Sequence, residues 1–428
     1  MKVVILGLWH LGCVTAACVA KFEQVVGLDF DPANITRLKN GTPPIFEPGL
    51  EQLLAAGVNT GRLSFTDDPR SACQDAELLW ICIDTPVDEQ DRVDLVPLEE
   101  SIAKCAPFLK PGTMILISSQ IPAGTSRFLE QKYPNFRFAY SPENLRLGKA
   151  IEIFLKADRV ILGVRTLKDA DELTPLLRHF TDRIVPVRTE SAEMIKHGIN
   201  SFLALSISFM NELSRICERV GADAKELELG LKSEARIGPR AYLSAGGPFS
   251  GGTLARDVVA LTEIGDAVHE RLVLIPAIKA SNDTHKNWTE AKLIEELKDL
   301  AGRKITILGL TYKPNTDTLR RSLAVEICRS LMAKGARIQA YDPAIQGIPA
   351  NLAISLASSI DEAVTHADAI VICTEWPAFR RVAWANILRA MAQPIVIDAN
   401  GFLSENLSTF PGIVYRQVGK PREERVFA

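Results

Sequence analysis

A glycine-containing turn near the start of the chain has the residue types and spacing of a dinucleotide-binding loop. Gly7 ends an apolar run and Gly12 follows, so two of the three glycines of a G-x-G-x-x-G fingerprint are present. The middle position holds Trp9, whose bulk must point away from a bound pyrophosphate or weaken its binding. Asp29 follows the next apolar run, where an acid hydrogen-bonds the ribose hydroxyls of NAD and repels the 2′-phosphate of NADP. The pattern predicts a site for NAD.

A long helical pattern over residues 190–221 carries a second set of polar residues. Its apolar residues recur at helical spacing and form one stripe, which consists of Ile195, Ile199, Phe202, Leu205, Phe209, Ile216 and Val220. Lys196, Asn200 and Asn211 fall within a narrow arc on the opposite side, because their separations are close to whole turns. Such an arc is either a solvated face or one side of a site, and the pattern alone leaves both interpretations open.

Two further segments are candidates for ligand contact. Residues 245–253 read AGGPFSGGT and predict a loop whose backbone bends sharply or approaches another group closely, before an expected helix that contains Asp257. A later strand-like run ends at Gly309 but is followed by Lys313 and Arg320 rather than by further glycines. Basic side chains at the end of such a strand suit a phosphate-bearing ligand better than a second NAD.

The elements that must position these residues occur twice along the chain. KVVILGL at 2–8 is echoed by KITILGL at 304–310, LLWICIDTP at 78–86 by AIVICTEWP at 369–377, and TMILISSQIP at 113–122 by QPIVIDANGF at 393–402. Short apolar runs separated by helical stretches indicate buried parallel strands. We therefore expect an α/β fold of two Rossmann-like, doubly wound domains joined by a long central helix. The expected boundaries are 1–190, 191–290 and 291–428.

Composition narrows the class of protein. The 428 residues are 47% hydrophobic and 24% charged, with a formal net charge of −3, so no basic field invites nucleic acid. No apolar run approaches the ~20 residues that cross a bilayer, and the first residues lack a signal-peptide layout, which favours the cytoplasm. The eight cysteines are scattered and are expected to be buried, reduced thiols. The six histidines show no metal-ligand spacing, so we assign no metal.

These motifs, in this order, resemble the UDP-glucose/GDP-mannose dehydrogenase family over essentially the whole chain. The similar segments are residues 27–50, Thr85-Pro86, residues 122–125, Ser141-Pro142-Glu143, residues 193–212, residues 309–317 and residues 374–376. The resemblance implies a homodimer in polysaccharide biosynthesis that oxidises the C6 alcohol of a nucleotide sugar to a carboxylate, with two NAD per turnover. UDP-glucose is the first substrate to expect. The three parts of the chain would then be an NAD-binding domain, a central dimerisation and active-site segment, and a nucleotide-sugar-binding domain.

The resemblance also implies roles for individual residues. Glu143 would act in acid–base chemistry, Lys196 and Asn200 would hold the developing oxyanion, and Asp257 would position a catalytic water. Thr253 would stand at the position of the nucleophile. The implied cofactor residues are Gly7, Trp9, Leu11, Gly12, Asp29, Thr85, Pro86 and Gln120. The implied substrate residues are Leu145, Arg236, Gly251, Lys313 and Arg320, with Arg236 reaching the sugar across a dimer interface.

The chain departs from the family pattern at three places. The family's nucleophilic cysteine lies in a loop resembling G-G-S-C-F-P-K-D, whereas residues 251–257 read GGTLARD. Thr253 stands at the cysteine position when the loop is counted back from Asp257; counted from the glycines, the cysteine is deleted. Gln120 follows Ser119 where the family has Ser-Thr, and residues 398–401 read DANG in place of Asp-Gly-Arg-Asn, so an arginine that could touch the substrate is missing.

The missing cysteine leaves three interpretations open, because a thiolate carries the second oxidation through a covalent intermediate. The first is an altered dehydrogenase whose reaction stops after two electrons or follows another route without this nucleophile. The second is an unchanged four-electron oxidation through direct hydration of the aldehyde. The third is a non-catalytic nucleotide-sugar-binding paralogue with a regulatory or scaffold role.

Overall fold

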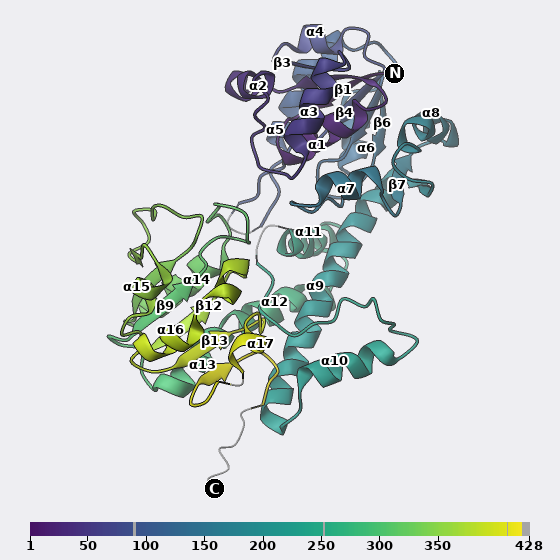
Figure 1. Ribbon diagram of the computed structural model, residues 1–428. Coiled ribbons are helices and arrows are strands. Elements are labelled where there is room, and N and C mark those ends of the chain that lie inside the picture. The colour runs from purple at the N-terminus through teal and green to yellow at the C-terminus, as the bar shows by residue number, and fades with distance from the viewer. Residues whose placement is uncertain (89–90, 251–252, 409, 422–428) are drawn as a thin grey trace. The chain divides into compact units, whose positions relative to one another are not determined.

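The computed structural model describes residues 1–88, 91–250, 253–408 and 410–421, and the chain divides into two compact units. Unit 1 comprises Met1–Ile199 with Glu263–His269, and unit 2 comprises Asn200–Thr262 with Glu270–Ala428. Each unit contains one β-sheet with helices packed around it (Figure 1). The expected α/β fold, with two Rossmann-like sheets and a long central helix, is confirmed.

The sheet of unit 1 has the strand order β3-β2-β1-β4-β5-β6-β7-β8. The strands are β1 (Lys2–Leu6), β2 (Gln24–Leu28), β3 (Leu63–Thr66), β4 (Leu78–Ile81), β5 (Met114–Ile117), β6 (Arg137–Tyr140), β7 (Val160–Val164) and β8 (Ile184–Arg188). Strands β1 to β6 are parallel, and β7 pairs antiparallel with β6. The order reverses direction between β1 and β4, and ligands of such sheets bind at the carboxyl ends of the strands at this point.

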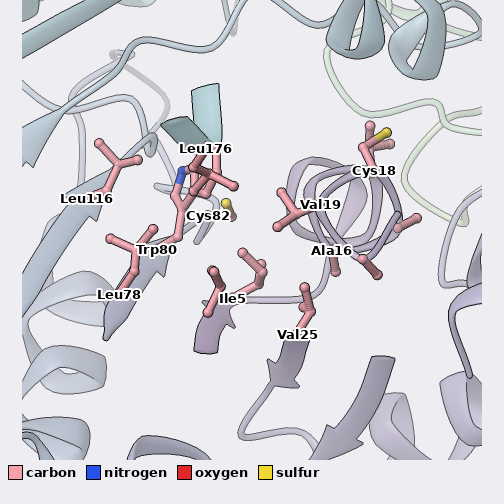
Figure 2. Close-up of a cluster of buried hydrophobic side chains, with 14 of the residues drawn as sticks. Ile5, Ala16, Cys18, Val19, Val25, Leu78, Trp80, Cys82, Leu116 and Leu176 are labelled. Carbon is pink, nitrogen blue, oxygen red and sulfur yellow. The ribbon is translucent and has the colours of Figure 1, made fainter. Parts of the chain in front are cut away.

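The helices of unit 1 follow the strands in turn. They are α1 (His10–Val19), α2 (Pro32–Lys39), α3 (Leu50–Asn59), α4 (Pro69–Cys73), α5 (Val96–Cys105), the 3₁₀ turn η1 (Ala106–Phe108), α6 (Thr125–Lys132), α7 (Ala150–Leu155) and α8 (Leu167–Leu177). Figure 2 shows Ala16 and Val19 of α1 facing a cluster that includes Ile5 of β1 and Trp80 of β4. The indole nitrogen of Trp80 donates to Ser118 Oγ at 2.9 Å, so this buried ring has no unsatisfied polar atom.

The sheet of unit 2 is wholly parallel and repeats the same order, β11-β10-β9-β12-β13-β14. Its strands are β9 (Lys304–Leu308), β10 (Arg337–Tyr341), β11 (Ser355–Leu356), β12 (Ala369–Ile372), β13 (Ile395–Asp398) and β14 (Val414–Arg416). Strands β9, β12 and β13 come from the three echoed sequence runs and occupy the places of β1, β4 and β5. The repeat in the sequence is therefore a repeat of structure.

The helices of unit 2 come both before the first strand of this sheet and between its strands. They are α10 (Ala224–Ser233), α12 (Leu274–Lys286), α13 (Trp288–Leu297), α14 (Leu323–Ala333), α15 (Ile360–Val364), the 3₁₀ turn η2 (Pro377–Arg381), α16 (Trp384–Ala390) and α17 (Ser404–Leu407). The helix α11 (Leu254–Ala267) begins in unit 2 and ends in unit 1. Within the described residues, none of the helices combines the length and the apolar character needed to span a bilayer.

The central helix α9 (Thr189–Val220) matches the predicted span within one residue at each end. Its polar arc is buried, with Lys196, Asn200 and Asn211 at 6% exposure or less. Its apolar stripe is largely exposed from Phe202 onward, at 64% for Phe202 and 69% for Val220. The arc is therefore part of the interior rather than a solvated face. Ile195 and Leu205 of the stripe pack against core clusters, whereas Phe202, Phe209, Ile216 and Val220 are exposed in the described chain.

Candidate active site

A cavity of about 360 Å³ lies at the carboxyl ends of β1 and β4 in unit 1. Its lining includes Gly7, Trp9, Asp29 and Lys104. Gly7 has a φ of +90°, which side chains other than that of glycine rarely tolerate. A Cβ on Gly12 would lie 1.7 Å from the carbonyl oxygen of Gly7, so only glycine allows α1 to begin this close to the turn. The two fingerprint glycines thus shape the cavity.

The start of α1 suits a bound pyrophosphate. Trp9 is the N-cap residue and offers no side-chain cap to the first turn, whose amide groups therefore suit an anionic acceptor. The Trp9 side chain is 45% exposed and forms part of the cavity wall. It borders the space in which a dinucleotide would lie.

Asp29 is held in place by the backbone of the same turn. Its Oδ2 accepts hydrogen bonds from the Leu8 amide at 2.8 Å and from Asn34 Nδ2 at 3.1 Å, and its Oδ1 accepts one from the Asp31 amide at 2.9 Å. A carboxylate has about four acceptor positions, so Asp29 keeps capacity for a ribose hydroxyl. These residues fit NAD, which when bound would supply the hydride acceptor.

The other four predicted cofactor residues, Leu11, Thr85, Pro86 and Gln120, lie outside the lining of this cavity. Thr85 Oγ1 donates to the Gln120 carbonyl at 2.7 Å, so the segments after β4 and β5 are joined by a buried bond. Pro86 is exposed, and the partly buried Leu11 packs against the hydrophobic core.

The segment after β6 brings Glu143 to Lys196 of α9 within unit 1. Lys196 Nζ donates to the Glu143 carbonyl at 2.6 Å and lies 3.3 Å from Glu143 Oε1. The amide of the half-buried Leu145 donates to Glu143 Oε2 at 2.7 Å. Lys196 is only 5% exposed, so its ammonium acts where water screens it weakly. An ammonium and a carboxylate in this arrangement can stabilise an alkoxide and take up a proton.

Asn200 lies one turn beyond Lys196 on α9 and belongs to unit 2. Its Nδ2 donates to Asp257 Oδ2 at 2.5 Å, which fixes the orientation of the amide. Asp257 is fully buried in the first turn of α11, where the helix dipole favours a negative charge. Thr253 directly precedes this helix and is exposed, and Gly251 lies outside the described residues.

Buried polar side chains hold the segment that leads to Thr253. Asn211 accepts from the Gly246 amide at 3.1 Å and donates to the Gly247 carbonyl at 3.3 Å. Asn282 pairs with both main-chain groups of Phe249, at 2.9 and 2.8 Å. The sequence interpretation missed Asn282, because a single polar residue on a helix gives no signal of its partner.

His285 was also missed, and its environment determines its charge. Its Nε2 donates to the Gly246 carbonyl at 2.8 Å, and the Arg215 guanidinium donates to its Nδ1 at 2.9 Å. Burial, reinforced by the Arg215 charge, lowers the pKa of His285 to about 4. The ring is therefore neutral at neutral pH and carries its proton on Nε2.

Asn400 occupies the position at which the resemblance places an arginine. Its Oδ1 accepts from the Gly247 amide at 2.7 Å, and its Nδ2 donates to Glu375 Oε1 at 2.8 Å. The Asn400 side chain is thus bonded to the glycine-containing segment and to Glu375, the third residue after β12.

The turn after β9 resembles the turn after β1, but the hydrogen bonds of its acidic residue, Asp342, differ from those of Asp29. Asp342 Oδ2 accepts from the amides of Leu310 and Thr311, from Thr311 Oγ1 and from Trp376 Nε1, at 2.7 to 3.1 Å. This oxygen is committed to the protein itself. Asp342 could have been found from the sequence, because it directly follows the second strand of its unit as Asp29 does.

The predicted substrate residues of unit 2 differ in exposure. Lys313 is half-buried and Arg320 is exposed, and both lie in the segment between Gly309 and α14. Arg236 is 87% exposed and forms an ion pair with Glu234 at 2.9 Å. The described contacts do not join Arg236 to the other predicted residues.

Fold and site together define a dehydrogenase with an NAD-binding Rossmann domain and a second, related nucleotide-binding domain. The three family models for UDP-glucose/GDP-mannose dehydrogenases match in order: the NAD binding domain at residues 1–181, the central domain at 190–284 and the UDP binding domain at 306–405. The chain belongs to the UDP-glucose/GDP-mannose dehydrogenase family. It is an NAD-dependent nucleotide-sugar dehydrogenase.

Individual relatives support this membership along the whole chain. The chain is 32% identical to UDP-glucose 6-dehydrogenase TuaD of Bacillus subtilis, covering 98% of this chain and 93% of that protein. It is 33% identical to UDP-glucose 6-dehydrogenase of Rhizobium meliloti, with 98% and 100% covered. The structure of a UDP-glucose dehydrogenase from Pyrobaculum islandicum is similar with a TM-score of 0.87 at 28% identity, covering 98% of each chain.

Proposed function

We propose that this protein oxidises a UDP-glucose-like nucleotide sugar by two electrons and releases a carbonyl product. The primary alcohol loses a hydride from carbon to NAD⁺ and a proton from oxygen, which gives an aldehyde, NADH and H⁺. The observation that carries the proposal is the absence of any cysteine from residue 218 to residue 327, with Thr253 just ahead of α11. The names of the relatives and the match to a UDP binding domain support the choice of nucleotide.

Four residues supply the chemistry in this proposal. Lys196 and Asn200 stabilise the alkoxide from which the hydride leaves, and Glu143 accepts or orders the proton. Asp257 orients the Asn200 amide, and the water that the resemblance assigns to Asp257 takes no part in this two-electron step. Their support is the burial of Lys196 beside Glu143 and the Asn200–Asp257 hydrogen bond.

Each of the three parts of the chain has a separate role in this proposal. Residues 1–190 bind NAD, residues 191–290 carry reaction groups and the dimer contact, and residues 291–428 bind the nucleotide sugar. Lys313 and Arg320 are cationic residues suited to its phosphates.

The existing thiols are poor replacements for a nucleophile in this segment. Cys217 and Cys328, the nearest in sequence on either side, are buried on α9 and α14. Burial raises the pKa of Cys217, and it raises the pKa of Cys328 to about 12, so both are thiols at neutral pH. A threonine hydroxyl is far less acidic than a thiol and does not form a thioester.

The test is the number of NADH molecules formed per nucleotide sugar consumed, at saturating NAD, over a panel of UDP- and GDP-sugars. We expect one NADH with UDP-glucose or a close analogue, and a carbonyl product that hydrazine traps. Two NADH per sugar would show that the four-electron reaction survives without the cysteine. No NADH with any sugar, together with measurable sugar binding, would favour a non-catalytic binder.

Matched variants make this test sharper. Thr253→Cys is expected to move the yield from one NADH toward two, whereas Thr253→Ser keeps a hydroxyl and stays at one. Lys196→Ala is expected to lower kcat by about 10²- to 10³-fold, the usual cost of losing a group that stabilises an oxyanion. Unchanged turnover in Lys196→Ala would remove that residue from the mechanism.

A homodimer formed through α9 is also part of the proposal. Phe202, Phe209, Ile216 and Val220 are all exposed and lie along one side of the helix over about 27 Å. Contiguous apolar surface of this kind marks an interface more often than it marks a free surface. In such a dimer, the exposed Arg236 would contribute to the sugar site of the other copy.

A further inference from the structure

A buried carboxylate connects the cofactor turn of unit 1 to the segment that carries Glu143. Glu47 is 3% exposed and lies shortly before α3. Its Oε1 accepts from the Ala150 amide at 2.9 Å, and its Oε2 accepts from the Gly148 amide at 2.7 Å. The same Oε2 lies 2.9 Å from His10 Nε2. Three donors from two separate segments therefore satisfy one buried charge, as burial of a carboxylate requires.

His10 is the first residue of α1 and lies between the two fingerprint glycines. Because an ionised carboxylate only accepts hydrogen bonds, His10 Nε2 carries a proton in this contact. The His10 side chain is thus tied to Glu47, while its own peptide belongs to the turn at which a pyrophosphate binds. A ligand that orders this turn also orders the His10 ring.

Residues 143–150 are held at both ends within unit 1. Lys196 binds the carbonyl of Glu143 at one end, and Glu47 binds the amides of Gly148 and Ala150 at the other. Gly148 has a φ of +87°, which glycine adopts readily, and the segment around it has no regular structure, so these side-chain bonds are what restrict it. In addition, α1 packs directly against α3, which follows Glu47 in the chain, and against α7, which follows Gly148.

We propose that Glu47 is a positioning residue that couples NAD binding to the conformation of residues 143–150. NAD at the N-terminus of α1 fixes the first turn and the His10 ring, and Glu47 then holds the Gly148 and Ala150 amides in one arrangement. Ordered in this way, the segment presents Glu143 and Leu145 in the positions that they have in this structure. The catalytic consequence rests on the proposed role of Glu143, whereas the coupling requires only that NAD binds.

Hydrogen exchange of the full-length protein tests the coupling without any sugar. We expect saturating NAD to slow exchange of the Gly148 and Ala150 amides by about fivefold or more, the lower end of ordinary coupling between sites. His10→Phe keeps an aromatic ring but removes the nitrogen donor, so it should still bind NAD and lose this slowing. Glu47→Gln, which keeps the shape of the side chain, should lose most of it. The control His179→Phe alters a ring stacked on Phe22 and should behave as the wild type.

Two results would overturn the proposal. One is wild-type exchange at Gly148 and Ala150 that NAD leaves unchanged, under conditions in which a thermal shift proves NAD is bound. The other is full NAD-dependent slowing in His10→Phe, which would mean that NAD contacts the segment directly. In a turnover assay, Glu47→Gln should lower kcat at least about tenfold while KM for NAD stays within about threefold. Failure of the proposed reaction would remove the turnover assay but leave the exchange test intact.

Discussion

Several polar side chains in unit 2 form hydrogen bonds with main-chain atoms of residues 246–249. Asn211 and Asn282 each use both ends of their amide group on main-chain atoms of residues 246–249, and His285 and Asn400 add one bond each. Glycine-containing segments have the most conformational freedom to lose, so such bonds are what give the segment one conformation. Residues 246–249 precede Thr253 and Asp257 in the chain, so in the proposed mechanism their order bears on the reaction.

At this scale the neutral state of His285 predicts a dependence of stability on pH. The pKa of His285 is about 4 in the folded protein and 6.5 ordinarily, so the unfolded chain binds a proton that the folded protein does not between these values. Stability from this residue is complete above pH 6.5 and is lost as the pH falls toward 4. Between pH 7 and pH 5 this contribution to the free energy of unfolding should fall by about 2 kcal/mol.

The comparison variant for this prediction is His285→Gln, which can still donate to the Gly246 carbonyl and does not titrate. Urea unfolding at both pH values measures the difference. An equal pH dependence in the two proteins would show that His285 is not held neutral.

Among the elements, α1 and the turn before it define the cofactor site through close packing. Gly12 has no room for a side chain, whereas Trp9 stands on the cavity wall with nearly half of its surface exposed. Position 12 therefore cannot accept a side chain, because it lies against the Gly7 carbonyl oxygen, whereas position 9 can accept a large one, because it faces open space. The same turn in unit 2 keeps its glycine at 309, but one oxygen of Asp342 accepts four hydrogen bonds from the protein, against two for either oxygen of Asp29 at most.

This difference predicts opposite outcomes for two substitutions in the turn. Trp9→Gly should change the dissociation constant of NAD by less than about tenfold, which is about 1.4 kcal/mol, because the amides of α1 and Asp29 remain. Gly12→Ala should abolish measurable binding, since its Cβ would overlap the Gly7 carbonyl. Isothermal titration with NAD measures both, and circular dichroism checks that each variant is folded. A gain of affinity well beyond tenfold in Trp9→Gly would mean that the indole obstructs the pyrophosphate.

For the molecule as a whole, α9 carries both the proposed reaction groups and the proposed dimer contact of the central segment. Its buried arc holds Lys196, Asn200 and Asn211, and its exposed stripe is the surface that we propose as the dimer contact. A helix with a polar interior side and an apolar exterior side reverses the usual arrangement of a surface helix. The reversal is stable when buried polar groups find partners inside and the apolar side is covered by association.

The prediction at this scale concerns mass in solution. Size exclusion with light scattering should give twice the chain mass of 46.9 kDa for the wild type. The double variant Phe202→Asp, Phe209→Asp should give the mass of one chain, because two carboxylates from each copy would have to be desolvated in the interface. Phe128→Asp, at a similarly exposed aromatic residue of α6, serves as the control and should leave the dimer intact. A wild-type monomer would contradict the proposed interface.

The sequence by itself determined the fold class, the family and the cofactor. Apolar runs, repeated with the same neighbours, specify parallel strands locally, and a glycine turn followed by an acid specifies a dinucleotide site. Those signals lie within a few dozen residues of one another and depend little on the rest of the chain.

Only the tertiary structure decided which side of α9 is buried, that Asn400 binds the Gly247 amide, and that Glu47 joins His10 to Gly148. Helical periodicity shows that a helix has two sides but not which of them meets the protein. The buried polar groups around residues 246–249 are satisfied by partners that lie far away in the sequence, from 33 positions for Asn282 and Phe249 to 153 for Gly247 and Asn400. Such pairs form when folding brings the segments together, and for that reason they leave no periodic signal in the sequence.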